Sequence, residues 1–234
     1  MILIFKSFNI IVKANCLVMK RLPIAQSTDC IRTRRGYTSG IHKWEVTWPA
    51  IQRGTHAVVG VGTSQAPLHL GGYQSLLGNS TTSWGWDLGS LQTFHNNQLT
   101  SSPLYPSTVT HQDQWHVPDI FTMILDMDNG TLGFAVGDQF LGWAHHELNS
   151  QGRLYPMVST GQSCLAVSVS QTFFLLVFGE CEIKLRYMGG LTTITLKEIA
   201  SDVIKAQLGR NGERLQEKVD CLELPISLKE YLLQ

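Results

Sequence analysis

The sequence lacks the signatures of several enzyme and metal-site classes. It contains no Walker phosphate-binding loop and no Gly-x-Ser-x-Gly nucleophile elbow, and no arrangement of cysteine and histidine stands out as catalytic. Its five cysteines are widely scattered and include no Cys-x-x-Cys pair, which argues against a disulfide framework and against a zinc site. The sequence therefore predicts a non-catalytic protein without a cofactor or metal, with reduced thiols and a cytosolic location.

The sequence also has no excess of charge of either sign. Lys plus Arg number 18 and Asp plus Glu number 18 among 234 residues, so the formal net charge is zero. Without an overall field to gather nucleic acid or an anionic membrane, the expected partner is a protein or a small molecule. The length allows one large β-domain with a short appendage, or two modest domains.

Long apolar runs are missing as well. The apolar stretch around residues 173–178 is too short to span a bilayer. Residues 1–12 are apolar, but Lys6 interrupts them, and no small-x-small cleavage site closes a clear hydrophobic region. We interpret this stretch as a β-segment, with a secretion signal as the alternative.

Between residues 10 and 187 the sequence shows short apolar or alternating runs separated by Gly, Pro, Asn and Asp clusters. This pattern is typical of an all-β sandwich. The expected strands are 10–12, 16–21, 42–48, 56–62, 83–88, 121–126, 131–136, 139–144 and 181–187. Between the strands at 121–126 and 131–136, Asn129-Gly130 is expected to supply the two positive-φ positions of a type I′ turn.

Two polar motifs are better explained by structure than by metal binding. Asp126-Met-Asp128 resembles part of a calcium loop but lacks the later Gly and Glu ligands, so turn chemistry is the favoured explanation. His145 and His146 are adjacent, so in a strand they point to opposite faces and cannot bind one ion. We expect both to be surface histidines.

Two further motifs are expected to serve packing. Gly60-Val-Gly62 lacks the third glycine and the helix of a dinucleotide fingerprint, which favours close strand packing. Trp84 and Trp86 lie on one face of a strand, and burial in the sandwich is favoured over a ligand role because indole rings bring a large apolar area.

The pattern changes at Gly189-Gly190. Apolar residues then recur at helical spacing, which predicts one amphipathic helix ending near Gly209. These apolar positions are Leu196, Ile199, Ala200, Val203, Ile204 and Leu208. A second, weak helix is indicated at 213–219, followed by a proline-interrupted tail at 222–232. Periodicity alone does not decide whether the first helix packs on its own domain or on a partner.

Several long motifs resemble one known family, the SPRY domain-containing SOCS box proteins, in their Gustavus-like branch. The resemblance extends from about residue 9 to residue 234. The motifs are Pro23-Ile-Ala-Gln-Ser-Thr-Asp29, Arg35-Gly-Tyr-Thr-Ser-Gly40, Gln52-Arg-Gly-Thr-His-Ala-Val-Val-Gly-Val61, Ala66-Pro-Leu-His69, Ser83-Trp-Gly-Trp-Asp87 and Leu125-Asp-Met-Asp-Asn-Gly-Thr-Leu132.

The resemblance implies an all-β SPRY (B30.2-type) sandwich of two antiparallel sheets over residues 1–190, and a small α-helical SOCS box over 191–234. It further implies that loops at one end of the sheets bind a short Asn-rich peptide with an acidic residue, of the Asp-Ile-Asn-Asn-Asn type. Tyr73 would offer a flat wall, Thr55 and Arg21 hydrogen-bond donors, and Gly179 a close backbone approach. The implied peptide-binding residues are Arg21, Pro23, Ala25, Thr55, Tyr73, Val177, Phe178 and Gly179.

The same resemblance implies that the SOCS box recruits elongin B and elongin C by helix-in-groove docking, with Leu196 as the anchor. The elongin-binding residues would be Leu196, Ile199, Ala200, Val203 and Ile204, and the cullin-binding residues Leu222, Leu224 and Pro225. For this branch the cullin would be cullin five, with its RING subunit. The implied function is a substrate-recognition adaptor of a ubiquitin ligase that promotes proteasomal degradation of its targets. A SPRY scaffold that recruits no ligase is the alternative.

Four departures from the family pattern bear on these expectations. Residues 161–176 are an insertion, and two origins are compatible with it: a retained intron and a genuine loop. Phe178 replaces a tryptophan and loses the indole N–H, which predicts weaker peptide binding. Ala200 replaces a cysteine, which predicts retained elongin binding with some lost packing. Glu223 replaces a proline and leaves the choice of cullin open.

Overall fold

The computed structural model of the chain describes residues 3–13, 18–72, 74–99, 104–110, 115–161, 164–170, 173–178 and 181–191. The chain divides into two compact units, Met1–Gly190 and Leu191–Gln234. Apart from Leu191, the second unit lies outside the described residues. The helices predicted at 196–208 and 213–219, and all the residues expected to contact elongin or cullin, are therefore outside them too.

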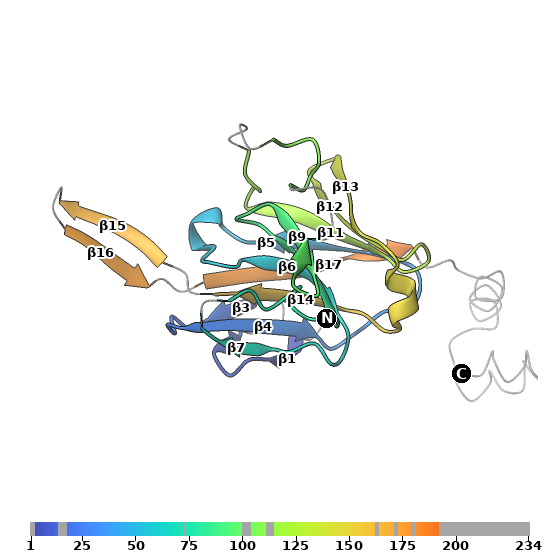
Figure 1. The fold of residues 1–234 in the computed structure, drawn as a ribbon, viewed down its shortest axis with the longest axis horizontal. Helices are drawn as coiled ribbons and strands as arrows, with labels where there is room; N and C mark the ends of the chain where they lie inside the picture. The colour runs from blue at the N-terminus through green and yellow to red at the C-terminus, as the bar shows by residue number, and fades with distance from the viewer. Residues whose placement is uncertain are drawn as a thin grey trace, which may run out of the picture. The chain divides into compact units, whose positions relative to one another are not determined.

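The first unit is built from two large antiparallel sheets, in agreement with the all-β expectation (Figure 1). Within the described residues the first sheet has the order β1-β4-β14-β6-β8-β9-β10, with β7 paired to β4. Its strands are β1 (Leu3–Lys6), β4 (Ser27–Thr33), β6 (Val58–Gly62), β7 (His69–Gly71), β8 (Ser83–Asp87), β9 (Gln92–His95), β10 (Gln98–Leu99) and β14 (Tyr155–Thr160).

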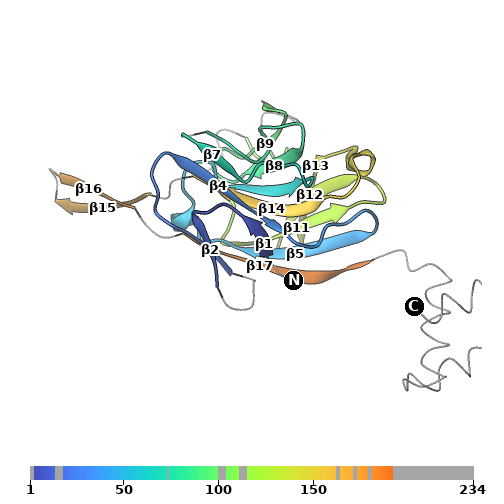
Figure 2. The same cartoon turned by 90° about the horizontal axis from the view of Figure 1, so that it is seen from below.

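The second sheet has the order β13-β12-β11-β5-β17-β3-β2 and forms the other layer of the sandwich (Figure 2). Its strands are β2 (Ile10–Val12), β3 (Val18–Arg21), β5 (Ile41–Thr47), β11 (Ile120–Asp126), β12 (Thr131–Val136), β13 (Gln139–His145) and β17 (Cys181–Leu191). Two short 3-10 helices, η2 (Ala50–Gln52) and η3 (Leu148–Gln151), lie in connections. Among the described residues there is no helix with the length and apolar character needed to cross a membrane.

Alternation of apolar residues explains how the second sheet faces the core. In β5, Trp44 and Val46 are buried while their neighbours are half-buried or exposed, and β11 alternates in the same way. Trp44 lies directly opposite Met123 in the β5–β11 register, so the two strands present one continuous inward face.

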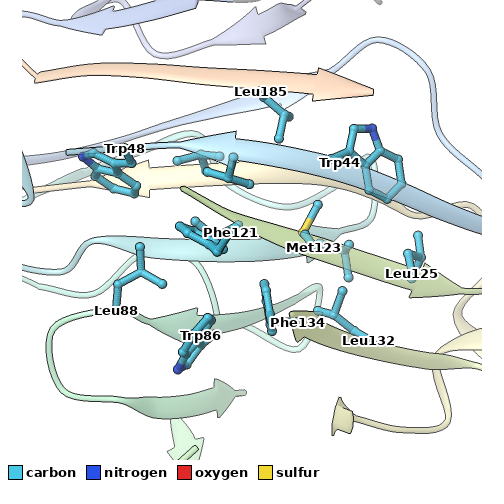
Figure 3. Close-up of a cluster of buried hydrophobic side chains, with 14 of the residues drawn as sticks. Trp44, Trp48, Trp86, Leu88, Phe121, Met123, Leu125, Leu132, Phe134 and Leu185 are labelled. Atoms are coloured by element: carbon cyan, nitrogen blue, oxygen red, sulfur yellow. The ribbon is translucent and has the colours of Figure 1, made fainter. Parts of the chain in front are cut away.

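Aromatic rings fill the space between the two sheets (Figure 3). The ring of Trp86 lies 4.6 Å from Phe134 and 5.9 Å from Phe121, centroid to centroid, so side chains of β8 meet those of β12 and β11. Trp84 is buried too, which confirms that both indoles of this strand belong to the core. Such tilted and edge-to-face pairs are favourable geometries beyond the apolar area that they bury.

The glycines of β6 serve close strand packing, as expected. Gly60 lies directly opposite Gly85 of β8. A Cβ atom on Gly60 would come within 2.0 Å of the Trp84 carbonyl oxygen, so no other residue fits at this position without moving the backbone.

The turn between β11 and β12 differs from the expected type I′ turn. Asp126 pairs with Thr131, so the loop between them has four residues. Gly130 has a positive φ of 66°, but the φ of Asn129 is not positive. The Asp126 carboxylate accepts hydrogen bonds from the Asp128 and Asn129 backbone N–H groups at 3.0 and 2.9 Å. This side-chain cap stabilises the longer turn, so the type I′ prediction is wrong and the assignment of the acids to turn chemistry is confirmed.

The expectation that both adjacent histidines lie at the surface is wrong for His145. His146 is exposed, but His145 is 2% exposed and its Nε2 lies 3.2 Å from the Gly85 carbonyl oxygen of the other sheet. The two side chains point to opposite faces of the sheet, as expected, and the face that carries His145 packs against the core.

The inserted segment forms a hairpin of its own. The strands β15 (Cys164–Ser170) and β16 (Phe173–Phe178) pair with each other, Cys164 opposite Phe178, and with neither large sheet (Figure 1). Val177 and Phe178, which the resemblance places in the peptide pocket, are the last two residues of β16.

Candidate functional site

The loops expected to bind a peptide meet at one end of the sandwich. Strands β3 and β14 end here, while β4, β6 and β17 begin here, because Arg21 pairs with Cys181 and Thr160 pairs with Asp29. The loops that follow or precede these strands carry Pro23, Ala25 and Thr55. All three are exposed, as residues that touch a ligand must be.

The side chain of Arg21 holds the loop 22–26 in place. The Arg21 guanidinium donates to the backbone carbonyls of Leu22, Ile24 and Ser27 at 3.1, 2.8 and 2.8 Å. These bonds fix the path of the backbone that carries Pro23 and Ala25. A rigid loop of this kind loses little conformational entropy when a peptide binds.

Arg21 itself does not reach the ligand side of the loop. Its side chain is fully buried and its Nε donates to Asp29 Oδ2 at 2.8 Å. The resemblance places Arg21 in the pocket as a donor to the peptide. In the structure its hydrogen bonds go to Asp29 and to the backbone of the loop that carries Pro23 and Ala25.

Asp29 is the acceptor at the centre of this arrangement. Its Oδ1 accepts from Ser7 Oγ at 2.6 Å and Asn9 Nδ2 at 3.1 Å and lies 3.0 Å from His69 Nδ1, while Oδ2 also accepts from Ser27 Oγ at 2.6 Å. The buried carboxylate thereby joins the N-terminal segment, the loop base and the strand β7.

The environment keeps Asp29 ionised. Burial disfavours the charged form and raises its pKa. Hydrogen bonds from Ser27, Ser7 and His69, together with the charge of Arg21, outweigh burial, so the pKa of Asp29 lies below its ordinary value of 3.8. The stability that this carboxylate contributes is present above pH 3.8 and is lost only as the pH falls through its folded pKa.

The segment around Tyr73 is attached to the same loop. The Gly72 backbone N–H donates to the Gln26 carbonyl at 2.8 Å, and Thr28 Oγ1 donates to the Gln74 carbonyl at 2.7 Å. Tyr73 lies outside the described residues, but its neighbour Gly72 is fixed against the loop that carries Ala25, and its neighbour Gln74 against the start of β4.

Thr55 is brought to this end by a second set of contacts. Arg53 donates to the carbonyls of Trp48 and Val117 at 2.8 and 2.5 Å. Gln52 Oε1 accepts from the Glu182 backbone N–H at 2.9 Å. The Thr55 carbonyl accepts from the Gly161 N–H at 2.9 Å, so this loop contacts both flanks of the inserted hairpin.

Not every predicted site residue can be placed. The backbone of Val177 and Phe178 belongs to β16, and Gly179 lies outside the described residues. The residues Asp29, Gln52 and Arg53, which hold the loops, were not singled out from the sequence. They fall within the long motifs 23–29 and 52–61, but a motif alone does not tell which of its polar side chains point inward.

A polar hollow of about 710 Å³ lies beside Thr55. Its walls include Thr55, Gln74, Asn79, Asp87, Gln92 and Asn97. No group of three or more His, Cys, Asp or Glu side chains suited to a metal ion occurs among the described residues. The available chemistry at this end is hydrogen bonding and shape, which suits recognition of a polar peptide.

The two packed antiparallel sheets are those of a SPRY domain. Residues 41–172 match the sequence model of the SPRY domain family. The crystal structure of the SPRY domain of human HERC1 resembles this fold with a TM-score of 0.52 and 19% sequence identity, covering 76% of this chain and 92% of that one.

Comparison over nearly the whole chain identifies a more specific family among the proteins with a SPRY domain. The chain is 44% identical to Protein gustavus of Drosophila melanogaster over 231 residues, covering 97% of this chain and 76% of that protein. It is 44% identical to SPRY domain-containing SOCS box protein 1 of Homo sapiens, covering 97% of this chain and 77% of that protein. The chain belongs to the SPRY domain-containing SOCS box protein family.

Proposed function

We propose that this protein is the substrate-recognition adaptor of an elongin B–elongin C–cullin–RING ubiquitin ligase. The sandwich binds a short Asn-rich peptide in target proteins, and the C-terminal unit docks on the ligase, which ubiquitinates the target for proteasomal degradation. The adaptor itself is not an enzyme and uses no cofactor. It acts in the cytosol, with cullin five as the cullin partner.

The peptide-binding part of this proposal is supported by one observation: loops that are held in fixed positions meet at one end of the sandwich. Exposed Pro23, Ala25 and Thr55 stand on backbone that is fixed by buried Arg21 and half-buried Arg53. An exposed recognition surface on a rigid base is the arrangement that binds peptides with a low ordering cost.

The ligase-docking half is supported by the extent of the sequence match. A 97% coverage of 234 residues leaves about seven residues unmatched, so the alignment with SOCS box proteins has to include most of Leu191–Gln234. The apolar stripe of Leu196, Ile199, Ala200, Val203 and Ile204 is the surface that we assign to elongin C, and Leu222, Leu224 and Pro225 are assigned to the cullin.

The peptide site is tested by measuring binding of a labelled Asp-Ile-Asn-Asn-Asn peptide. We expect Tyr73→Ala to weaken binding by about thirtyfold or more, because truncation of an aromatic anchor in a binding pocket typically costs about 2 kcal/mol or more. Phe140→Ala, which truncates an exposed aromatic ring on β13, is the matched control and leaves affinity unchanged. Equal affinity of wild type and Tyr73→Ala would refute the pocket assignment.

The ligase half is tested by co-purification from cells. Leu196→Ala is expected to release elongins B and C, because truncation of a buried leucine anchor costs about 2–5 kcal/mol. Lys197→Ala, on the predicted polar face of the same helix, keeps them bound. Recovery of substrate peptide without elongin by the wild-type protein would favour the alternative of a SPRY scaffold without ligase activity, which Ala200 and Glu223 motivate.

A further inference from the structure

The polar hollow beside Thr55 continues the proposed peptide site. Thr55 lines both, and Gln74, another wall residue, directly follows Tyr73 in the chain. Of the other peptide-binding residues implied by the family resemblance, those whose side chains the structure describes, Arg21, Pro23 and Ala25, do not line the hollow. It therefore lies where residues next to the peptide core would pass.

One acidic side chain stands among the described residues that line this hollow, that of Asp87 at the end of β8. Its Oδ1 accepts hydrogen bonds from the Gly89 and Ser90 backbone N–H groups at 2.9 and 3.1 Å and so caps the β8–β9 turn. Its Oδ2 accepts no hydrogen bond from the described residues, and Asp87 makes no ion pair with any of them.

The rest of the wall does not neutralise this charge. Among the described residues that line the hollow there is no lysine or arginine, and His56 is the only titratable one besides Asp87. The amide side chains of Asn79, Gln92 and Asn97 are polar but uncharged and offer oxygen acceptors. Such a surface attracts a group that carries positive charge and several donors, and it repels a carboxylate.

We propose that this hollow is a specificity subsite that receives a basic side chain of the substrate, arginine or lysine, next to the Asn-rich core, and that Asp87 is its ion-pair partner. The inference rests on the proposed peptide-binding function and adds a charge preference outside the core. Substrates with an acidic residue at that flank are disfavoured by repulsion from Asp87.

The test is a set of core peptides extended at either end by Arg, Gln or Glu, with binding measured at low and high salt. We expect the Arg-extended peptide to bind about fivefold more tightly than the Gln-extended one at one of the two ends, and the Glu-extended peptide to bind least tightly. The preference shrinks at high salt because the hollow is open to solvent.

Asp87→Asn is the decisive variant. Its side-chain oxygen can still cap the β8–β9 turn, but the charge is gone, so the Arg-over-Glu preference disappears while the unfolding midpoint shows that the variant is folded. Asp138→Asn removes an exposed acid on another hairpin and is the matched control, in which the preference persists.

Two results separate the inference from the function on which it rests. If the unextended core binds but Arg, Gln and Glu extensions are equivalent, or if Asp87→Asn keeps the full preference, the subsite is wrong and the peptide site stands. If the unextended core does not bind at all, both fall.

Discussion

His145 is a buried titratable group whose charged form the fold excludes. Burial lowers the pKa of His145 to about 4 from an ordinary 6.5, His95 and His146 lower it further, and the hydrogen bond to Gly85 opposes them. Because the unfolded chain binds this proton near pH 6.5 and the folded chain only near pH 4, the fold loses stability across that interval.

We therefore expect His145 to reduce the free energy of unfolding by about 3 kcal/mol as the pH falls from 6.5 to 4, and to have no effect above that range. Urea denaturation at a series of pH values measures it. His145→Gln retains a donor toward Gly85 and does not titrate, so its curve should be flatter. Parallel curves for the two proteins would contradict the assignment.

Arg21 is the second residue with a measurable individual role. Replacement by lysine keeps the charge but removes the planar fork that reaches Asp29 and three carbonyls together. We expect Arg21→Lys to lower the free energy of unfolding by about 2–4 kcal/mol. It should also weaken peptide binding, because the loop 22–26 loses its anchor.

The same substitution at Arg186 is the control for this prediction. Arg186 forms an exposed ion pair with Glu45 at 3.1 Å, and Arg186→Lys should change stability by less than about 0.5 kcal/mol. Denaturant unfolding and peptide titration of both variants decide the matter. Comparable small effects at the two positions would show that the buried guanidinium does not organise the site.

At the scale of elements, the sequence predicted most strands that are rich in apolar residues and missed β4, which is mostly polar. Strands β5, β11 and β12 were predicted within one residue of their observed bounds. Strand β4 is buried along its whole length although its residues, Ser-Thr-Asp-Cys-Ile-Arg-Thr, are mostly polar. The side chains of Ser27, Thr28 and Asp29 can be buried because they make hydrogen bonds within the Asp29 network and to the Gln74 carbonyl, and nothing local indicates this.

Strand β14 was missed for a different reason. It lies between β4 and β6 in the middle of the sheet, yet it contains Pro156, which sequence reasoning takes as evidence against a central strand. The loop residues of the peptide site came from family resemblance alone. The residues that position those loops, Asp29 and Arg53, required the structure because their partners are distant in sequence.

The inserted hairpin can be tested as an element. Because β15 and β16 pair with neither large sheet, deletion of residues 161–176 should change the free energy of unfolding of the sandwich by no more than about 1 kcal/mol. The deletion also joins Thr160 directly to Val177, which the family resemblance implies is the usual connection, and should strengthen peptide binding. Calorimetry and peptide titration of the deletion variant measure both effects.

A loss of folding in that variant would show that the hairpin is part of the sandwich's structure. Transcript sequencing across the codons for Thr160 and Val177 separately decides whether the segment is translated. The hairpin of β15 and β16 pairs with neither large sheet, and residues 173–178 carry no charge. Both features favour aggregation, so the deletion variant should aggregate less than the full chain.

At the scale of the whole molecule, the division into Met1–Gly190 and Leu191–Gln234 predicts separable activities. A fragment ending at Leu191 retains β17 and should unfold at the same denaturant midpoint as the full chain. It should bind the core peptide with unchanged affinity and should recover no elongin B or C from cells.

The outcome that would contradict this separation is a fragment that unfolds earlier or loses peptide binding. Either result would indicate that the sandwich depends on the C-terminal unit for its stability or for its site. The full-length chain with Leu196→Ala is the control, because it keeps the C-terminal residues and removes only the proposed elongin anchor.

The buried Asp29 carboxylate has a practical consequence for anyone who wants to redirect this adaptor to a new target. The N-terminal segment, the base of the loop and β7 all bond to this carboxylate. The proposed recognition surface therefore consists of exposed residues that can be replaced and a buried foundation that has to be kept. Libraries that vary Pro23, Ala25 and Thr55 while preserving Arg21 and Asp29 should yield folded clones with altered ligand preference, whereas libraries that randomise the foundation should yield mostly insoluble protein.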